Sequence, residues 1–280
     1  RGGGNSLAPA SFFTSCQKVS TCYNSDIMHH NKSFAFTLAE FLITLGIIGV
    51  VAAMTLPSLI AKHQEKQWVT AFLHTYSVLN NAYRMVQNEN GTFEDWADVT
   101  ITNTDGKPNR SSRANGAAIY NVMIKPYVQV NEAFLEAGNN SCIPEKSYQL
   151  NKEENPSFNV EMVNTHRPTV SLVSGECIVL GNDFGDFFVD VNGKKKPNTL
   201  GKDQFLFSFD VIKSEVIRPG YLQRGWTDQA KYCDRTSSNG WYSGISCGNW
   251  VLRNNNMDYL HISPEDVKKK WPGNPYSSDW

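Results

Sequence analysis

The feature that most constrains this chain is a long apolar segment that contains a single ionised side chain. Between Ser33 and Ala61 the only charged residue is Glu40. A run of about 20 apolar residues is long enough to cross the hydrocarbon core of a bilayer as a helix. A carboxylate inside such a helix is energetically costly, so its presence indicates a functional role. The sequence therefore predicts a membrane-anchored protein and singles out Glu40.

The remainder of the chain has the composition of a soluble protein. Residues 61–280 are numerous enough for one large domain with a substantial core, or for two small ones. The formal net charge is −1, which provides no extended positive field for nucleic acid or an anionic membrane. We therefore expect no nucleic-acid partner.

The cysteines indicate the compartment. None of them forms a C-x-x-C motif, which argues against a zinc ribbon or a thioredoxin-type site. Four follow the apolar segment, and an even number beyond a membrane anchor favours disulfides in an oxidising compartment. The alternative is four buried free thiols in a cytosolic domain. Of the three possible pairings we favour the one between sequence neighbours, Cys142 with Cys177 and Cys233 with Cys247.

The apolar segment differs from a secretory signal peptide. A signal peptide has an apolar core of about 7–15 residues followed by a small-x-small cleavage site. Here the run is longer and continues directly into a helical pattern. A short, polar and weakly basic tract that begins with Met28 precedes the run. We expect residues 1–35 to be a leader whose true start is Met28.

The tract 32–40 (KSFAFTLAE), together with the apolar run and Pro57, resembles the type IV pilin and type II secretion pseudopilin superfamily. The resemblance implies that a prepilin peptidase cuts between Ala35 and Phe36 and then N-methylates Phe36. Counted from Phe36, Glu40 is the fifth residue and Pro57 the twenty-second, the family's positions for its glutamate and its helix-kinking proline. The family usually has Gly before the cut, where this chain has Ala35.

The resemblance implies assembly rather than catalysis. It implies that Glu40 pairs with the α-amino group of Phe36 on a neighbouring subunit, which offsets the cost of burying both charges. Pro57 would permit a kink. The alternatives are an interfacial Glu40 on an ordinary anchor and a helix that ends at Pro57. The implied partners are other subunits through the N-terminal helix, the prepilin peptidase and an inner-membrane assembly platform.

The pattern after the anchor predicts an α+β head. An apolar stripe with alternating three- and four-residue steps continues the helix to about Asn88. We expect a transmembrane or filament-core helix over 36–60, its amphipathic half over 61–90, and an extracytoplasmic globular head over 91–280.

Strand patterns in the head predict an antiparallel sheet of about four strands that packs on the amphipathic half of the helix. The same layout, a long N-terminal transmembrane helix that continues into a head with an antiparallel sheet, is implied by the pilin resemblance. The segment 117–130 fits a short helix or a strand. The four strand patterns lie at 169–173, 177–180, 187–191 and 205–211. In the last of them phenylalanines alternate with Leu206, Ser208 and Asp210, a period-two pattern that predicts a half-buried strand.

A calcium site is one interpretation of the segment that follows the third strand pattern. Asp190, Asn192 and Asp203 offer oxygen ligands, with Asp183 and Asp186 nearby. The spacing is not that of an EF-hand, and no glutamate closes the loop. Some pseudopilins carry calcium in a loop near the C-terminus, so the resemblance is compatible with this interpretation. The alternative is a turn held by side-chain-to-backbone hydrogen bonds.

No motif of a catalytic site occurs in the sequence. Gly-x-Ser-x-Gly, His-Glu-x-x-His, the P-loop and the Rossmann fingerprint are all absent, so we do not expect an enzyme. We expect a pilin-like structural subunit of a type II secretion pseudopilus, with a type IV or competence pilin as the alternative. From another class, the alternative is a membrane-anchored extracytoplasmic enzyme or carbohydrate-binding protein.

The expected location is the cytoplasmic membrane, with a single span, the N-terminus inside and the head outside. Assembly would then place the chain in a periplasmic or cell-surface filament. Positive residues flank the span on both sides, so the positive-inside rule does not decide this topology. The cysteines decide it, because their disulfides require an oxidising environment.

Overall fold

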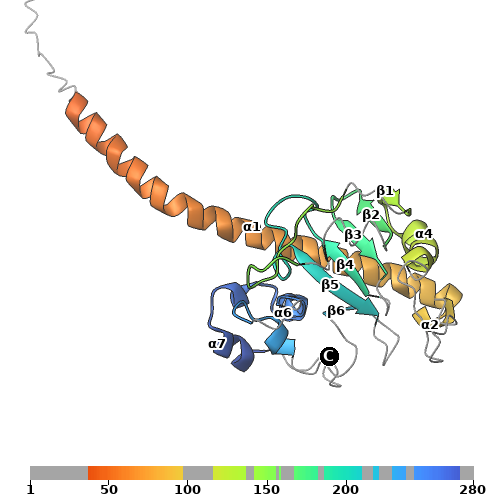
Figure 1. Ribbon diagram of the computed structural model, residues 1–280. Coiled ribbons are helices and arrows are strands. Elements are labelled where there is room, and N and C mark those ends of the chain that lie inside the picture. Colours follow the sequence, from red (N-terminus) through yellow and green to blue (C-terminus); the bar gives the residue numbers. More distant parts are fainter. Residues whose placement is uncertain are drawn as a thin grey trace, which may run out of the picture. The chain divides into compact units, whose positions relative to one another are not determined.

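The computed structural model describes a chain of two compact units, residues 1–52 and 53–280. Helix α1 (Leu38–Asn90) begins in the first unit and continues into the second (Figure 1). The residues described are 37–96, 116–136, 142–155, 158, 167–181, 186–209, 217–220, 229–237 and 243–271.

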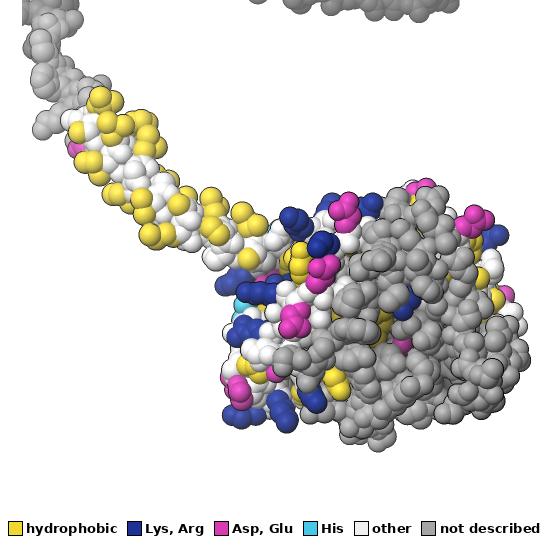
Figure 2. Space-filling view, in the orientation of Figure 1, with side chains coloured by type: hydrophobic (Ala, Val, Ile, Leu, Met, Phe, Trp, Pro, Cys, Tyr) yellow, Lys and Arg dark blue, Asp and Glu magenta, His cyan; other side chains and the backbone are white. Residues whose placement is uncertain are grey.

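The described part of the first unit is the N-terminal portion of α1. Its large hydrophobic side chains are exposed; Leu38 and Ile48, for example, are 75% and 63% exposed. Figure 2 shows hydrophobic side chains along the visible face of this portion. By length and composition, α1 is the one helix among the described residues that is apolar enough to cross a membrane.

The second unit contains an antiparallel sheet whose strands follow one another in chain order, so that each strand pairs with the next. Six strands are present among the described residues, where the sequence predicted about four. The four predicted strands are confirmed, and two edge strands, the first and the last, are additional. The strands are β1 (Val130–Phe134), β2 (Thr169–Leu172), β3 (Cys177–Leu180), β4 (Asp186–Asp190), β5 (Gln204–Phe209) and β6 (Ile217–Pro219).

The sheet packs on the second half of α1 through aromatic side chains. The Phe72 ring lies 4.6 Å from that of Phe205 and 5.3 Å from that of Phe207. Further along the helix, Tyr83 lies 4.8 Å from Phe209, centroid to centroid. These side chains are fully buried. The apolar stripe of the sequence therefore forms the contact between helix and sheet, as predicted.

The opposite face of the sheet is also covered, which differs from the half-buried strand that the alternation in β5 predicted. Leu206 packs in a second core with Val179 and Phe188, beneath Ile143 and Phe158 from the segment between β1 and β2. All six residues of β5 are buried. The polar residue Ser208 suggested a solvent-facing side, but it is buried and donates a hydrogen bond to the carbonyl oxygen of Gly220 at 3.0 Å.

Short helices complete the second unit. The segment that fitted either a helix or a strand is helical over η1 and α4, and the C-terminal part forms helices that the sequence analysis did not predict. In α7, Ser263 caps the helix by accepting a hydrogen bond from the backbone N–H of Asp266 at 3.1 Å. The helices are α2 (Phe93–Trp96), η1 (Ile119–Ile124), α4 (Lys125–Tyr127), η2 (Gln229–Tyr232), α6 (Cys247–Asn254), η4 (Asp258–Leu260) and α7 (Pro264–Lys269).

Candidate functional site

Glu40, the predicted assembly residue, closes the N-terminus of its own helix. Its Oε2 accepts hydrogen bonds from the backbone N–H of Thr37 at 2.8 Å and from the Thr37 hydroxyl at 2.9 Å. The Thr37 hydroxyl in turn accepts from the backbone N–H of Glu40 at 3.2 Å. This reciprocal arrangement is a capping box. The predicted cleavage residues Ala35 and Phe36 lie outside the described residues.

Along the apolar segment of α1, large apolar side chains are exposed from Leu38 to Ile60. Gly46 and Gly49 add small residues to this surface, and apart from their chain neighbours and the local helix backbone no described atom lies within 4 Å of where a Cβ would stand on either. Such an extended apolar surface needs lipid or other helices to cover it. The exposed side chains are Leu38, Phe41, Leu42, Ile43, Leu45, Ile47, Ile48, Val50, Val51, Met54, Leu56, Leu59 and Ile60.

Pro57 lies inside α1, and the helix continues through it to Asn90. The alternative interpretation, a helix that ends at Pro57, is therefore wrong. Proline lacks a backbone N–H and removes one hydrogen bond of the helix ladder. Pro57 is thus a proline within a continuous helix.

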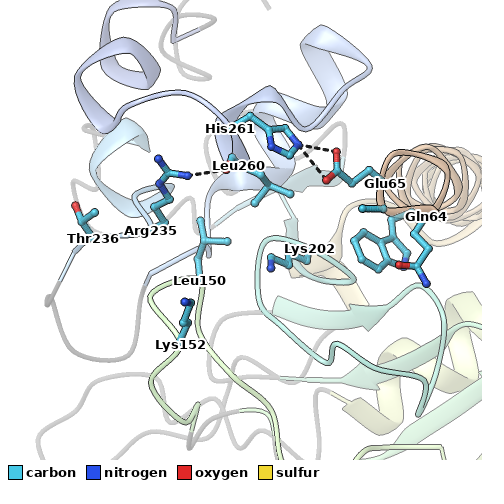
Figure 3. Close-up of a pocket in the computed structure, with 11 residues that line it drawn as sticks. Gln64, Glu65, Leu150, Lys152, Lys202, Arg235, Thr236, Leu260 and His261 are labelled. Carbon is cyan, nitrogen blue, oxygen red and sulfur yellow. Dashed lines mark hydrogen bonds and ion pairs between the residues drawn. The ribbon is translucent and has the colours of Figure 1, made fainter. Parts of the chain in front are cut away.

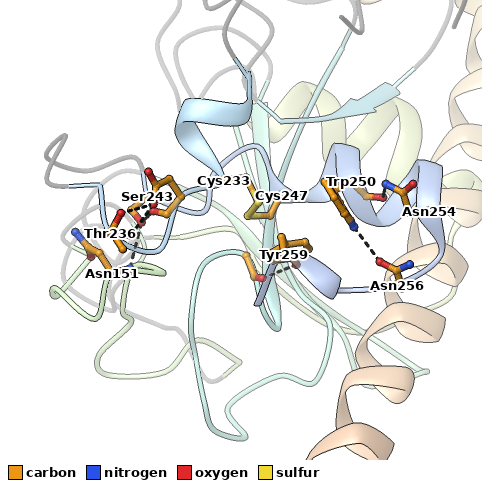
Figure 4. Close-up of a disulfide and its surroundings, with 11 residues drawn as sticks. Asn151, Cys233, Thr236, Ser243, Cys247, Trp250, Asn254, Asn256 and Tyr259 are labelled. Carbon is orange, nitrogen blue, oxygen red and sulfur yellow. Dashed lines mark hydrogen bonds between the residues drawn. A yellow bond between two sulfur atoms is a disulfide. The ribbon is translucent and has the colours of Figure 1, made fainter. Parts of the chain in front are cut away.

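The structure contains both sequence-local disulfides, Cys142–Cys177 and Cys233–Cys247, with Cα–Cα distances of 5.6 and 4.8 Å. The first ties the segment that covers the sheet's second face to the start of β3. The second joins the end of η2 to the start of α6, next to Tyr259 (Figure 4). Two disulfides fit a head in an oxidising, extracytoplasmic environment.

The calcium candidates Asp190 and Asp203 lie together, fully buried, at the ends of β4 and of the turn before β5. Asp190 accepts hydrogen bonds from the backbone N–H of Asn192 at 3.2 Å and from Nε2 of Gln204 at 2.9 Å. Asp203 accepts from the backbone N–H groups of Asn198 and Thr199, at 2.9 and 2.7 Å. Each of the four carboxylate oxygens of Asp190 and Asp203 thus accepts a hydrogen bond from an N–H group. This arrangement fits the alternative interpretation, a turn held by side-chain-to-backbone hydrogen bonds.

These surroundings do not fit a cation, and we derive no role for calcium. Burial raises the pKa of Asp190 well above its usual range, with the nearby Asp203 as the second cause. Burial also raises the pKa of Asp203, to about 6. Within the described ranges, no group of three or more His, Cys, Asp or Glu residues could hold a metal. Asp186 is buried within β4, and Asp183 lies outside the described ranges.

A basic pocket, which the sequence analysis missed, opens beside the second half of α1. It has a volume of about 530 Å³, within the range of about 300–1,000 Å³ that is common for small-molecule sites. Lys152, Lys202 and Arg235 line it, together with Trp68 from the helix (Figure 3). The three cations come from separate turns that share no sequence motif, so no local sequence pattern predicts the pocket.

Glu65 and His261 form one wall of this pocket. The Nε2 atom of His261 lies 2.9 Å from Oε2 and 3.0 Å from Oε1 of Glu65. The same two residues also line a second cavity along α1, which is lined as well by Lys62 and Lys66. The contact between Glu65 and His261 therefore separates the basic pocket from this second cavity.

Residues 58–233 match the model of a family of unknown function (DUF6613). The chain belongs to this family. The DUF6613 match begins directly after Pro57 and ends at Cys233, so it contains the second half of α1, the sheet, and both Lys152 and Lys202. The apolar segment from Leu38 to Pro57 precedes it. No curated protein and no solved structure matches the chain.

Proposed function

We propose that the chain is a pilin-like structural subunit, cut before Phe36 by a prepilin peptidase and assembled through α1 into a type II secretion pseudopilus. The observation that carries this proposal is the exposed apolar surface of α1, whose only ionised side chain is Glu40 at its beginning. A plain membrane anchor needs the apolar surface but not the carboxylate. A helix that packs among its own copies has a use for both.

The geometry of Glu40 supports this role. Both hydrogen bonds from Thr37 reach Oε2, so Oε1 can still accept from a further donor. Cleavage before Phe36 would create a new α-amino group two residues from the helix start at Leu38, and a neighbouring subunit would bring its own to Glu40. Pairing the two charges offsets the cost of burying each among apolar helices.

The rest of the chain fits a filament subunit with an extracytoplasmic head. The aromatic contacts between Phe72 and the sheet fix the head on the same helix that carries the apolar surface. The disulfides favour an oxidising environment for the head. A type IV or competence pilin would share these features, and the choice of a pseudopilus is part of the proposal.

Two substitutions separate the capping role of Glu40 from its proposed charge pairing. Glu40→Gln keeps the capping box, since Gln serves at this position as Glu does, but removes the charge. Thr37→Val removes the capping hydroxyl and keeps the charge. We expect Glu40→Gln to insert in the membrane normally but to lose most chemical cross-linking between copies, and Thr37→Val to retain it.

The readout is cross-linking of the full chain in its native membrane, with membrane extraction as the insertion control. Equal cross-linking of the parent and Glu40→Gln would mean that the carboxylate only caps the helix. Loss of cross-linking in Thr37→Val alone would lead to the same conclusion. Either result would overturn assembly through Glu40.

A further inference from the structure

The basic pocket brings cationic side chains from three distant turns to one space. Lys152 lies in the segment between β1 and β2, Lys202 in the turn before β5, and Arg235 after η2. In Figure 3 the amino ends of Lys152 and Lys202 point toward the same opening, and Arg235 lies across from them. An anion in this space would meet donors from several directions.

The charges that line the pocket do not cancel. Glu65 is the only carboxylate among the described residues that line it, and His261 Nε2 lies 2.9 Å from its Oε2. The guanidinium of Arg235 donates one hydrogen bond, from Nη1 to the carbonyl oxygen of Leu260 at 2.7 Å. Arg has five N–H donors, so this bond orients the guanidinium and leaves others for a ligand. The pocket is therefore net positive.

Part of the pocket is apolar. Trp68 and Ala61 line it from the helix, and Leu150 and Leu260 from the head. Pockets of this size, with a few polar groups among apolar ones, are typical of small-molecule sites. The lining thus suits an anionic group joined to a small apolar body.

The position of the pocket along α1 further restricts the kinds of ligand that can reach it. Ala61 directly follows Ile60, the last exposed large apolar residue of the run. Glu65 lies five residues beyond Ile60, or about 7.5 Å along a helix at about 1.5 Å per residue. The headgroup layer on each side of a bilayer core is about 5–7.5 Å thick. A helix that leaves the membrane core at Ile60 therefore places Ala61 and Glu65 at headgroup level.

We propose that this pocket binds a phosphate group, carried by an anionic phospholipid headgroup or by a soluble phosphate compound. Lys and Arg donors form charge-assisted hydrogen bonds with phosphate oxygens, and three cations match a group with several acceptor oxygens. The lipid source rests on the membrane span of the proposed function. The anion site itself depends only on residues of the second unit.

A second basic cavity supplies a matched control. Lys194 and Lys196 line it, but its third cation, Lys146, pairs with Glu154 at 3.2 Å, and Glu145 also lines it. Replacing Lys194 and Lys196 by Gln removes the same charge as replacing Lys152 and Lys202. A ligand that responds only to total charge would respond equally to both changes.

The test uses the full chain in non-ionic detergent. Isothermal calorimetry measures binding of inorganic phosphate, and native mass spectrometry compares binding of phosphatidylglycerol with that of phosphatidylcholine. We expect K152Q/K202Q to bind at least about tenfold more weakly than the parent, as for the loss of two charge-assisted contacts. K194Q/K196Q should stay within about twofold of the parent, since it leaves those contacts intact.

Selective binding of phosphatidylglycerol alone would identify a lipid headgroup, and binding of inorganic phosphate would identify a soluble phosphate. Failure of the parent chain to bind either probe would overturn the site, as would equal binding by the two double variants. Thermal melting of each variant checks its fold. Glu40→Gln leaves the pocket intact, so a loss of assembly and a loss of phosphate binding are read separately.

Discussion

His261 contacts both carboxylate oxygens of Glu65 through Nε2, although the two residues are 196 positions apart in the chain. The contact ties the C-terminal segment after η4 to α1. It also forms the wall between the basic pocket and the cavity beside Lys62. The segment after η4 is thereby fixed to the helix just beyond the end of the apolar run.

Replacing His261 by Ala should lower the stability of the second unit slightly. The His261 side chain is 57% exposed and that of Glu65 is 19% exposed, and exposed ion pairs contribute about 0.2–1 kcal/mol. Thermal melting of the full chain in detergent measures the change. Lys146→Ala, which breaks the more exposed pair with Glu154, is the control. A larger loss in the control would contradict this structural role of the Glu65 contact.

Removing a disulfide should cost more stability for the bridge that closes the longer loop. The pair Cys142–Cys177 spans 35 residues and Cys233–Cys247 spans 14. The chain-entropy relation gives about 4 kcal/mol for the first and about 3 kcal/mol for the second. Urea unfolding of the two double Cys→Ala variants checks the order. If the shorter loop proved the more costly to open, local packing around α6 would outweigh loop entropy.

The stability of the second unit should fall as the pH rises from about 4 toward 7. Burial raises the pKa of Asp190 well above its usual range and that of Asp203 to about 6. In the unfolded chain the pKa of Asp is about 3.9. In this window the folded state binds more protons than the unfolded state, so the free energy of unfolding decreases with increasing pH.

Asp190→Asn should flatten this pH dependence and raise the urea midpoint at pH 7. Its oxygen can still accept from Asn192, and Gln204 can turn its Oε1, which has no hydrogen-bond partner, toward the new amide. Glu136→Gln, a change at an exposed carboxylate, is the control and should leave the slope unchanged. An unaltered slope in Asp190→Asn would show that this carboxyl group titrates alike in both states.

The sequence predicted those parts of the fold that have a strong local period. The stripe that includes Phe72 and Tyr83, and the phenylalanines of β5, were found because each recurs at helix or strand spacing. The edge strands β1 and β6 were missed. In β1 only Phe134 is buried, and β6 has three residues and ends in Pro219, so neither shows alternation.

Among the candidate sites, too, only those formed by residues close in sequence could be predicted. Glu40 and Pro57 stand in a contiguous motif that can be read directly from the sequence. Lys152, Lys202 and Arg235 meet only because the fold brings three turns that are distant in sequence to one place. Ser208 looked like a solvent-facing residue, since pairing with a buried carbonyl group cannot be read from its neighbours in sequence.

The most direct test of the central claim is the mass of the mature N-terminus in the native membrane-extracted protein. Processing as a prepilin predicts a terminal peptide that begins at Phe36 and carries one added methyl group. A terminus at Met28 or upstream of it, without methylation, would contradict the account. The apolar part of α1 would then be an ordinary anchor, and the function would have to be sought in the head.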